Sequence, residues 1–339
     1  MTDRCYVIAE IGVNHNGDEA LAKKLIDVAA AAGADAVKFQ TFYADELVTR
    51  SASKAAYQIA NTENDNSQYQ MLKSLELDDG TYIRLNDHCA ERGIEFLSTP
   101  FSERAADLLE RIGVGAYKVS SGDLTHLPLL RHIARKGRPI ILSSGMAVLS
   151  EIEDALTAIY EEGNLQVSVL HCVSNYPAAP TDCNLAAIQT IAQAFGVPVG
   201  WSDHTMGEAI SLAAVARGAS IIEKHITLDR AMSGPDHKAS MEPAEFKVFV
   251  ANIRAVESSI GDGRKLPTEQ ERETAKLGRR SLVTARALQA GEELTALDLV
   301  ILRPGTGIPP RYLPYVIGRR LKVDLEENVP LTLGYLHGG

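Results

Sequence analysis

The chain has 339 residues, of which 45% are hydrophobic and 23% are charged, as is typical of a soluble globular protein with one large domain and a smaller one. Its formal net charge of -10 argues against nucleic acid or an anionic membrane as a partner. The four cysteines follow no metal or disulfide spacing, and no apolar run approaches the roughly 18 residues of a membrane span. We therefore expect a protein of the reducing cytoplasm.

From residue 5 to residue 260 the sequence repeats one pattern, in which a short β-rich run precedes an amphipathic helical stretch. The predicted strands cover residues 5–9, 36–39, 95–97, 116–119, 140–142, 166–170, 197–200 and 221–223. The predicted helices cover residues 20–32, 80–92, 105–112, 127–135, 149–160, 184–195, 208–217 and 243–259. Eight such units in about 250 residues predict an α/β fold of the TIM (β/α)8 barrel type. The alternative is an open, doubly wound sheet, but the chain lacks a Gly-x-Gly-x-x-Gly fingerprint.

Two segments depart from this pattern. Residues 44–79 are longer than a normal βα loop and are polar in the middle, at 61–67, so they form either a binding insert or a solvated excursion. Residues 263–279 are charged and are expected to form a flexible linker. This linker would join the barrel domain, residues 1–262, to a small and mostly β domain at residues 280–339.

Polar side chains collect where the predicted strands end, which is where a TIM barrel carries its catalytic groups. These residues are Glu10, Lys38, Gln40, Thr99, Lys118, Ser121, Ser143, Ser174, Tyr176, Ser202 and Glu223. A lysine that directly follows a buried strand is costly unless an anion neutralises it, so Lys38 and Lys118 predict a phosphate or carboxylate site. Each serine alone indicates no more than a turn or a cap, and only the joint position of these hydroxyls favours binding.

His204 and His225 follow two neighbouring predicted strands that are separated by one helix-length segment. A parallel arrangement would bring both imidazoles to one edge of the sheet, where they could hold a divalent metal. Glu223 lies two residues before His225, and strand alternation points both side chains the same way. Core histidines without a ligand role are the alternative. Asp236, in a Gly-Pro-Asp loop after the eighth strand, is a further candidate carboxylate, although these three residues are also an ordinary turn signal.

Ten short motifs lie in a fixed order along the chain. They are AEIGVNHNG (9–17), VKFQT (37–41), STPF (98–101), YKVSSG (117–122), LSSGM (142–146), HC (171–172), SDHT (202–205), EKH (223–225), GPD (234–236) and RPGTG (303–307). Together they resemble the sialic acid synthase family, and the resemblance covers both predicted domains. It implies a TIM barrel followed by a small antifreeze-like (SAF) domain. It also implies a domain-swapped homodimer, in which the small domain of one chain covers the barrel mouth of its partner.

The resemblance implies a transferase that condenses phosphoenolpyruvate with N-acetylmannosamine and water, giving N-acetylneuraminate and phosphate. In this family's chemistry the C–O bond of phosphoenolpyruvate is cleaved. A divalent metal, with Mn²⁺ expected and Mg²⁺ or Co²⁺ as options, polarises the sugar aldehyde. Synthesis of N,N'-diacetyllegionaminate from 2,4-diacetamido-2,4,6-trideoxymannose is the main alternative, and pseudaminic acid synthesis is a more distant one. A metal-dependent aldolase would act without phosphoenolpyruvate, and a barrel that only binds a ligand would need no metal pair.

By the same resemblance, individual positions receive roles. His204 and His225 would bind the metal, and Glu10 would handle protons or stabilise the cation near C2 of phosphoenolpyruvate. Glu10, Glu223 and Asp236 are the candidate catalytic carboxylates. The implied substrate ligands are Lys118, Ser121, Ser143 and Ser202 for the phosphate, Lys38 and Thr99 for the carboxylate, and Gln40, Tyr176, Asp236 and Arg303 of the partner subunit for the sugar. Ser174 stands where some members have a phosphate-binding asparagine, and this is the one departure from the pattern.

Overall fold

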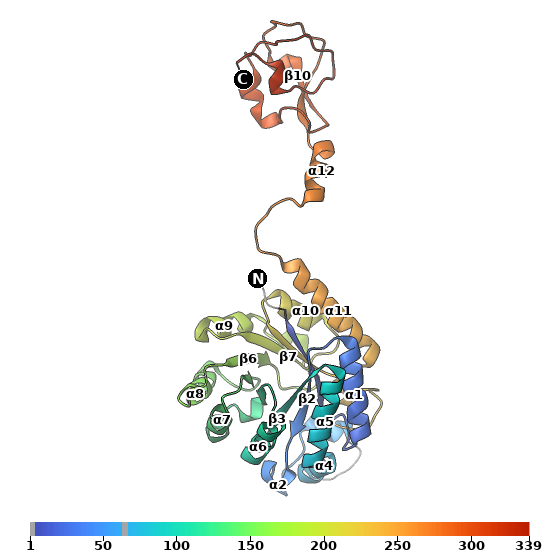
Figure 1. The fold of residues 1–339 in the computed structure, drawn as a ribbon, viewed down its shortest axis with the longest axis vertical. Coiled ribbons are helices and arrows are strands. Elements are labelled where there is room, and N and C mark those ends of the chain that lie inside the picture. Colours follow the sequence, from blue (N-terminus) through green and yellow to red (C-terminus); the bar gives the residue numbers. More distant parts are fainter. Residues whose placement is uncertain (1–3, 63–66, 339) are drawn as a thin grey trace. The chain divides into compact units, whose positions relative to one another are not determined.

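The computed structural model describes residues 4–62 and 67–338, and the chain divides into two compact units, Met1–Asp262 and Gly263–Gly339 (Figure 1). The first unit is built on a parallel sheet with the strand order β3-β2-β1-β8-β7-β6-β5-β4. Its strands are β1 Tyr6–Gly12, β2 Ala36–Thr41, β3 Glu95–Pro100, β4 Tyr117–Val119, β5 Ile140–Ser143, β6 Val167–Cys172, β7 Val199–Asp203 and β8 Ile221–His225. The two end strands, β3 and β4, lie against each other, so the sheet nearly closes into the predicted TIM barrel.

Helices follow the strands and cover the outside of the barrel (Figure 1). They are α1 Glu19–Ala32, α5 Asp79–Arg92, α6 Glu103–Ile112, α7 Leu127–Ala134, α8 Leu149–Tyr160, α9 Ala186–Phe195, α10 Ala209–Ala216 and α11 Pro243–Ile260. Local signals fix their ends: the Asp18 side chain accepts hydrogen bonds from two backbone amides at the start of α1, and Gly33 ends this helix with a φ of 82°. No helix within residues 4–62 and 67–338 combines the length and apolarity that a membrane crossing requires.

Several strands run further than the sequence predicts. β1, β2 and β3 each continue two or three residues past the predicted end, because residues that the sequence places in loops pair with a parallel neighbouring strand. Glu10 therefore lies inside β1, where it is in register with Lys38 of β2 and with His225 of β8. The backbone of these residues is fixed by the sheet and does not depend on a loop.

The barrel interior has an apolar layer beneath a polar one. The apolar layer consists of Ile8, Ala36, Leu97, Ala116, Ile141, Leu170 and Ile221. Because side chains alternate along a strand, the residue two positions further faces the same interior. Those positions carry Glu10, Lys38, Thr99, Lys118, Ser143, Cys172 and Glu223. The alternation of the strands therefore places one ring of polar groups at the carboxyl end of the barrel.

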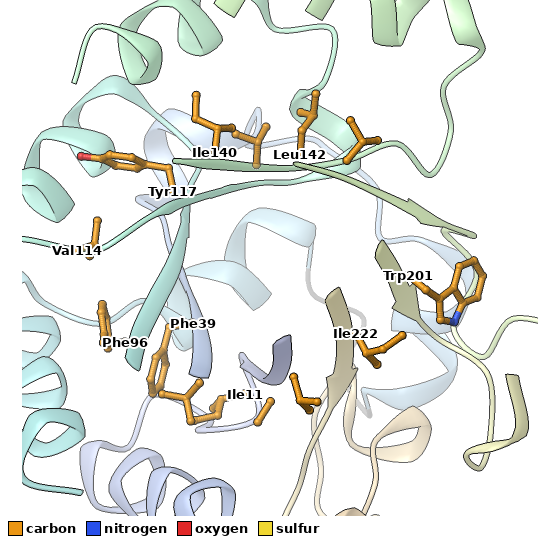
Figure 2. Packing of buried hydrophobic residues seen from close by; sticks show 14 of the residues in the cluster. Ile11, Phe39, Phe96, Val114, Tyr117, Ile140, Leu142, Trp201 and Ile222 are labelled. Carbon is orange, nitrogen blue, oxygen red and sulfur yellow. The ribbon is translucent and has the colours of Figure 1, made fainter. Parts of the chain in front are cut away.

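The opposite faces of the strands pack against the helices and form the larger hydrophobic core. Figure 2 shows the side chains of Phe96, Tyr117 and Trp201 on the side of their strands that faces away from the barrel interior. The rings of Phe39 and Phe96 stack with 5.4 Å between their centroids. This core fixes the position of each strand, and hence of the polar groups on its inner face.

The long insert after β2 is folded, at least in its described parts. It contains α2 Ala44–Leu47, α3 Ala56–Asn61 and α4 Gln68–Leu75. Met71 and Leu75 of α4 are buried against Val13 and Phe42 of the barrel. The sequence left open whether this insert is a solvated excursion, and its packing excludes that for α4. The polar stretch at 61–67 includes residues 63–66, which lie outside the described residues.

The second unit pairs β9 Ser281–Thr284 with β10 Leu299–Leu302 in an antiparallel sheet and has its own apolar core. The expectation of a flexible linker is wrong for residues 269–278, which form helix α12. Thr268 caps this helix by accepting a hydrogen bond from the amide of Glu271, whose carboxylate accepts one from the amide of Thr268 in return. The loop after β10 is bonded to α12 as well, since the Gly305 amide donates to the Lys276 carbonyl at 2.8 Å.

Candidate active site

Two lysines and two glutamates form a buried charged cluster at the carboxyl end of the barrel. Lys38 Nζ lies 2.6 Å from Glu10 Oε2 and 3.9 Å from Glu223 Oε1. Lys118 Nζ lies 3.9 Å from Glu223 Oε2. None of the four side chains is more than 6% exposed. Glu223 therefore stands between lysines from β2 and β4, while Glu10 pairs with Lys38 across the β1–β2 ladder.

The two glutamates act as internal counter-ions, so burial of the lysines does not by itself require a bound anion. Burial opposes the charge on Lys38, but Glu10 and Glu223 outweigh it and raise the pKa of Lys38 above its ordinary value. Burial raises the pKa of Glu10 to about 7, in spite of the Lys38 ammonium. A carboxyl group that titrates near neutral pH can lose its charge when an anion binds, which would leave the cluster with a net positive charge.

Each lysine also has a hydroxyl partner from the neighbouring strand. Lys38 Nζ donates to Thr99 Oγ1 at 3.2 Å, and Lys118 Nζ donates to Ser143 Oγ at 2.6 Å. All four side chains are buried. These contacts hold the ammonium groups in defined directions, as anion recognition requires.

The glutamates are oriented in the same way by donors from their own surroundings. Ser202 Oγ donates to Glu223 Oε1 at 3.1 Å, and Gln40 Nε2 donates to Glu10 Oε1 at 3.3 Å. Glu223 Oε2 has no hydrogen-bond partner among the described residues, although it is buried. That oxygen is therefore available to a ligand or a water molecule at the barrel mouth.

Ser121 and Ser174 meet around Gly145, a residue whose role sequence reasoning missed. The Gly145 amide donates to Ser121 Oγ at 2.9 Å, and Ser121 Oγ lies 3.2 Å from Cys172 Sγ. A Cβ atom on Gly145 would lie 2.2 Å from Ser174 Oγ and 2.8 Å from Ser121 Oγ. A side chain at position 145 would displace these hydroxyl groups, so the loops after β4, β5 and β6 approach closely at this point.

His204 and His225 lie close together, with 5.6 Å between their ring centroids. The ring of Tyr176 lies 4.1 Å from that of His204 and 5.8 Å from that of His225. His204 Nδ1 donates to the Val173 carbonyl at 2.7 Å, which leaves its Nε2 with a lone pair. His225 Nδ1 is buried and has no hydrogen-bond partner among the described residues.

The histidine pair suits a divalent metal. Burial lowers the pKa of His204 below its ordinary value and lowers that of His225 well below it, so both imidazoles are neutral at physiological pH. Neutral imidazole is the form that binds metals. Nδ1 of His225 is buried and makes no hydrogen bond to the described residues, so it could serve as a metal ligand. No group of three or more His, Cys, Asp or Glu in residues 4–62 and 67–338 is arranged as a metal site, so the pair would leave further coordination positions to water or substrate.

Asp236 lies in the loop after β8, where it is buried. Burial raises its pKa to about 6, and the nearby charge of Lys38 opposes this rise. Ser240 Oγ donates to the Asp236 carbonyl at 2.7 Å, and Asn61 Nδ2 of the insert donates to the Pro235 carbonyl at 2.8 Å. The insert thus contacts the loop that carries Asp236, which gives α3 a structural connection to the candidate site.

Arg303 differs from the other predicted site residues, because it belongs to the second unit. It is exposed and follows β10. Its proposed contact with a sugar stays a prediction.

Sequence reasoning also missed a buried ion pair between Asp203 and Lys224, the residues that directly precede the two histidines. A charged residue at an outward position of an apolar strand was the signal that could have revealed it.

The chain matches the model of the NeuB family over residues 25–265 and the SAF domain over residues 279–334. It is 45% identical to an N,N'-diacetyllegionaminic acid synthase of Legionella pneumophila, covering 96% of this chain and 93% of that protein. It is 48% identical to the synthase of the same name from Campylobacter jejuni, covering 95% and 97%. The solved N-acetylneuraminic acid synthetase of Leptospira borgpetersenii is similar with a TM-score of 0.72 and 36% identity, covering 80% of this chain and 90% of that one. The chain therefore belongs to the NeuB family, the sialic and legionaminic acid synthases, and carries a SAF domain.

Proposed function

We propose that the protein is a nonulosonic acid synthase that condenses phosphoenolpyruvate with an N-acetylated amino sugar and water and releases phosphate. The observation that carries this proposal is that the lysine–glutamate cluster lies directly beside the histidine pair. Glu10 is in register with His225, and Glu223 precedes His225 by two residues on the same strand. An anion site beside a metal site is what the joining of an anionic enol ester to a carbonyl group requires.

In the proposed reaction, C3 of phosphoenolpyruvate forms a bond to the aldehyde carbon of the open-chain sugar. The aldehyde oxygen takes up a proton and becomes a hydroxyl group. Water adds at C2 and gives up one proton. Its second proton leaves with the phosphate as the bond between C2 and the bridging oxygen breaks and the C2 hydroxyl becomes a keto group. The reaction thus needs a place for phosphate, a place for the carboxylate, and a group that stabilises positive charge near C2.

Different residues of the charged cluster would perform these tasks. Lys118 with Ser143, and Ser121 beside the Gly145 amide, lie on the strands and loops of one side of the mouth and would bind the phosphate. Lys38 with Thr99 would bind the carboxylate. Ser202 would contribute through its hydroxyl group, which also orients Glu223.

Glu10 is the group we assign to the chemistry near C2. It is buried beside Lys38, and its pKa of about 7 lets it hold or release a proton at physiological pH. In its ionised form it would stabilise positive charge at C2, because water is largely excluded there. Glu223 would favour the charged form of both lysines from its position between them, and at Lys118 it partly offsets the burial that lowers the pKa of that ammonium group.

His204 and His225 would hold a divalent metal, for which Mn²⁺ is our first choice and Mg²⁺ or Co²⁺ the alternatives. When bound, this metal would act as a Lewis acid on the sugar aldehyde. Tyr176 packs against both imidazoles and would contact the sugar beside them. Gln40 and Asp236 would bind its hydroxyl or amide groups.

The sugar is proposed from the relatives. Both legionaminic acid synthases share more identity with this chain than the Leptospira synthetase does, which favours 2,4-diacetamido-2,4,6-trideoxymannose as substrate. The sequence resemblance alone implies N-acetylmannosamine as the sugar. It is now the second candidate, and the similarity to the Leptospira synthetase supports it. Phosphate release from phosphoenolpyruvate, measured with Mn²⁺ and each sugar in turn, tests the activity and the choice together.

Controls make that assay decisive. EDTA should abolish phosphate release and added Mn²⁺ should restore it, whereas a double variant of His204→Ala and His225→Ala should stay inactive. An aldolase would turn over sugar acids without phosphoenolpyruvate and release no phosphate. Full activity of the double variant would remove the metal assignment.

A homodimer in the cytoplasm completes the proposal. We infer that the SAF domain of one chain reaches the barrel mouth of its partner, as the family resemblance implies, and brings Arg303 to the sugar. A planar guanidinium suits a directional hydrogen bond to an amide carbonyl. The four cysteines are all unpaired and buried, which is compatible with a reducing compartment.

A further inference from the structure

Behind the two histidines lies a second buried ion pair that the proposed reaction does not use. Asp203 of β7 and Lys224 of β8 are in register, and Lys224 Nζ lies 3.0 Å from Asp203 Oδ2. Their side chains are 0% and 1% exposed. Because side chains alternate along a strand, this pair faces away from the interior into which Ser202 and Glu223 point.

The ion pair forms hydrogen bonds with the residue that follows His204. Asp203 Oδ1 accepts hydrogen bonds from the Thr205 amide at 2.8 Å and from Thr205 Oγ1 at 2.7 Å. Lys224 Nζ donates to the Thr205 carbonyl at 2.5 Å. The residues on both sides of His204 are therefore bonded to Lys224, and Lys224 is itself the residue before His225.

The network is anchored on its outer side by helix α10. Ser211 Oγ donates to Asp203 Oδ2 at 2.6 Å. The carboxylate of Asp203 thus has four partners, which come from the neighbouring strand, from the turn around His204 and from the helix. A group held in this way has one available position and fixes the backbone to which it belongs.

Packing alone does not account for the pair. Buried ion pairs can often be replaced by apolar side chains of similar size without loss of stability, and their best-supported role is to specify one geometry. Here the geometry concerned is the spacing between residues 204 and 225. A metal held by two imidazoles depends on that spacing, because the outer contacts of ligands set their orientation.

We propose that Asp203 and Lys224 are positioning residues that fix the separation and orientation of the His204–His225 pair, and thereby set its affinity for a divalent metal. This inference rests on the proposed role of the two histidines as metal ligands. The pair touches neither substrate nor metal and acts through the backbone of residues 203–205 and 224–225.

The decisive variant is Lys224→Met, measured by titrating the full-length, metal-free protein with Mn²⁺ and following free Mn²⁺ by electron paramagnetic resonance. Lys224 lies close enough to lower the pKa of both imidazoles through its charge. If only charge mattered, its removal would tighten the binding of a cation. Loss of the positioning contacts predicts the opposite sign, with binding weakened about 10- to 100-fold.

A matched control separates this effect from general damage. Arg254 forms a partly buried ion pair with Asp35, a residue that precedes β2 at the other end of the barrel, with 2.6 Å between Arg254 Nη2 and Asp35 Oδ2. Arg254→Met should leave the dissociation constant for Mn²⁺ within about twofold of the wild-type value. If Lys224→Met does not fold, Asp203→Asn keeps the shape of the side chain and should weaken binding about tenfold.

The outcomes distinguish a failure of the metal assignment from a failure of the positioning role. If wild-type protein and the double variant of His204→Ala and His225→Ala bind Mn²⁺ equally, the metal assignment fails. If the histidines bind Mn²⁺ but folded Lys224→Met or Asp203→Asn binds it as tightly as the wild type, the positioning role is wrong and the metal assignment stands.

Discussion

Glu10 and Lys38 are in register on adjacent strands, and their side chains form an ion pair of 2.6 Å that is almost completely buried. Lys38 keeps its charge because Glu10 and Glu223 outweigh its burial, whereas burial raises the pKa of Glu10 to about 7. The pair therefore combines a fixed positive charge with a carboxyl group that can change protonation state. Such a combination suits a site that binds an anion and then moves a proton.

Glu10→Gln tests that role. The variant keeps the size of the side chain but removes its charge, so we expect kcat to fall by about 10²- to 10⁴-fold, with smaller changes in either KM. The wild-type rate should rise with pH through about 7, as Glu10 ionises, and the variant should lack this limb. A thermally unstable variant with near-normal kcat would show that Glu10 is only structural.

Lys118→Met should act mainly on phosphoenolpyruvate. Loss of one charge-assisted contact is expected to raise the apparent KM for phosphoenolpyruvate about 10- to 150-fold. Lys136→Met is the matched control, because Lys136 is also a nearly buried lysine in ion pairs, but with Asp107 and Glu110 of α6 on the outside of the barrel. An effect of Lys118→Met on the sugar alone would contradict the assignment.

Asp236 should make stability depend on pH. Its pKa is about 6 in the folded protein and about 3.9 when unfolded, so between these values only the folded state binds the proton. Its contribution is therefore fully present below pH 4 and is lost as pH rises through 6, by about 3 kcal/mol in total. Urea unfolding at pH 4 to 7.5 should show this decline as a growing difference in stability between the wild type and Asp236→Asn, because other titrating groups, such as Glu10, affect both proteins alike. Parallel curves for the two proteins would refute the buried, protonatable state.

Complementation tests the role of Arg303. Chains carrying His204→Ala and chains carrying Arg303→Ala, each nearly inactive alone, should regain activity when mixed. If Arg303 acts across chains, a mixed dimer has one mouth with both lesions and one intact, so a random mixture should reach about a quarter of the wild-type rate. Verified exchange of chains without recovery would place Arg303 in its own barrel or outside the reaction.

Much of the barrel could be predicted because strand and helix periods are local properties of the sequence. The ends of β1 and β3 could not, since pairing with neighbouring strands extended them into polar residues. Helix α12 was missed for a different reason: its residues are charged, and the capping contacts of Thr268 were not weighed against the general polarity of the segment.

The candidate site was likewise predictable only where local sequence properties determine it. The inward positions of Lys38 and Lys118 followed from alternation, but their partners Glu10 and Glu223 depend on which strands are neighbours in the barrel. The close approach at Gly145 likewise depends on three loops that meet only after folding. Roles that came from the family resemblance, above all that of Arg303, stay predictions.

The most direct test of the proposed chemistry follows the bridging oxygen of phosphoenolpyruvate. The protein is given Mn²⁺, 2,4-diacetamido-2,4,6-trideoxymannose or N-acetylmannosamine, and phosphoenolpyruvate labelled with ¹⁸O between carbon and phosphorus. Mass spectrometry of both products then locates the label. Cleavage of the C–O bond predicts labelled phosphate and an unlabelled sugar acid. Label retained in the sugar acid, or sugar acid formed without release of phosphate, would contradict the account.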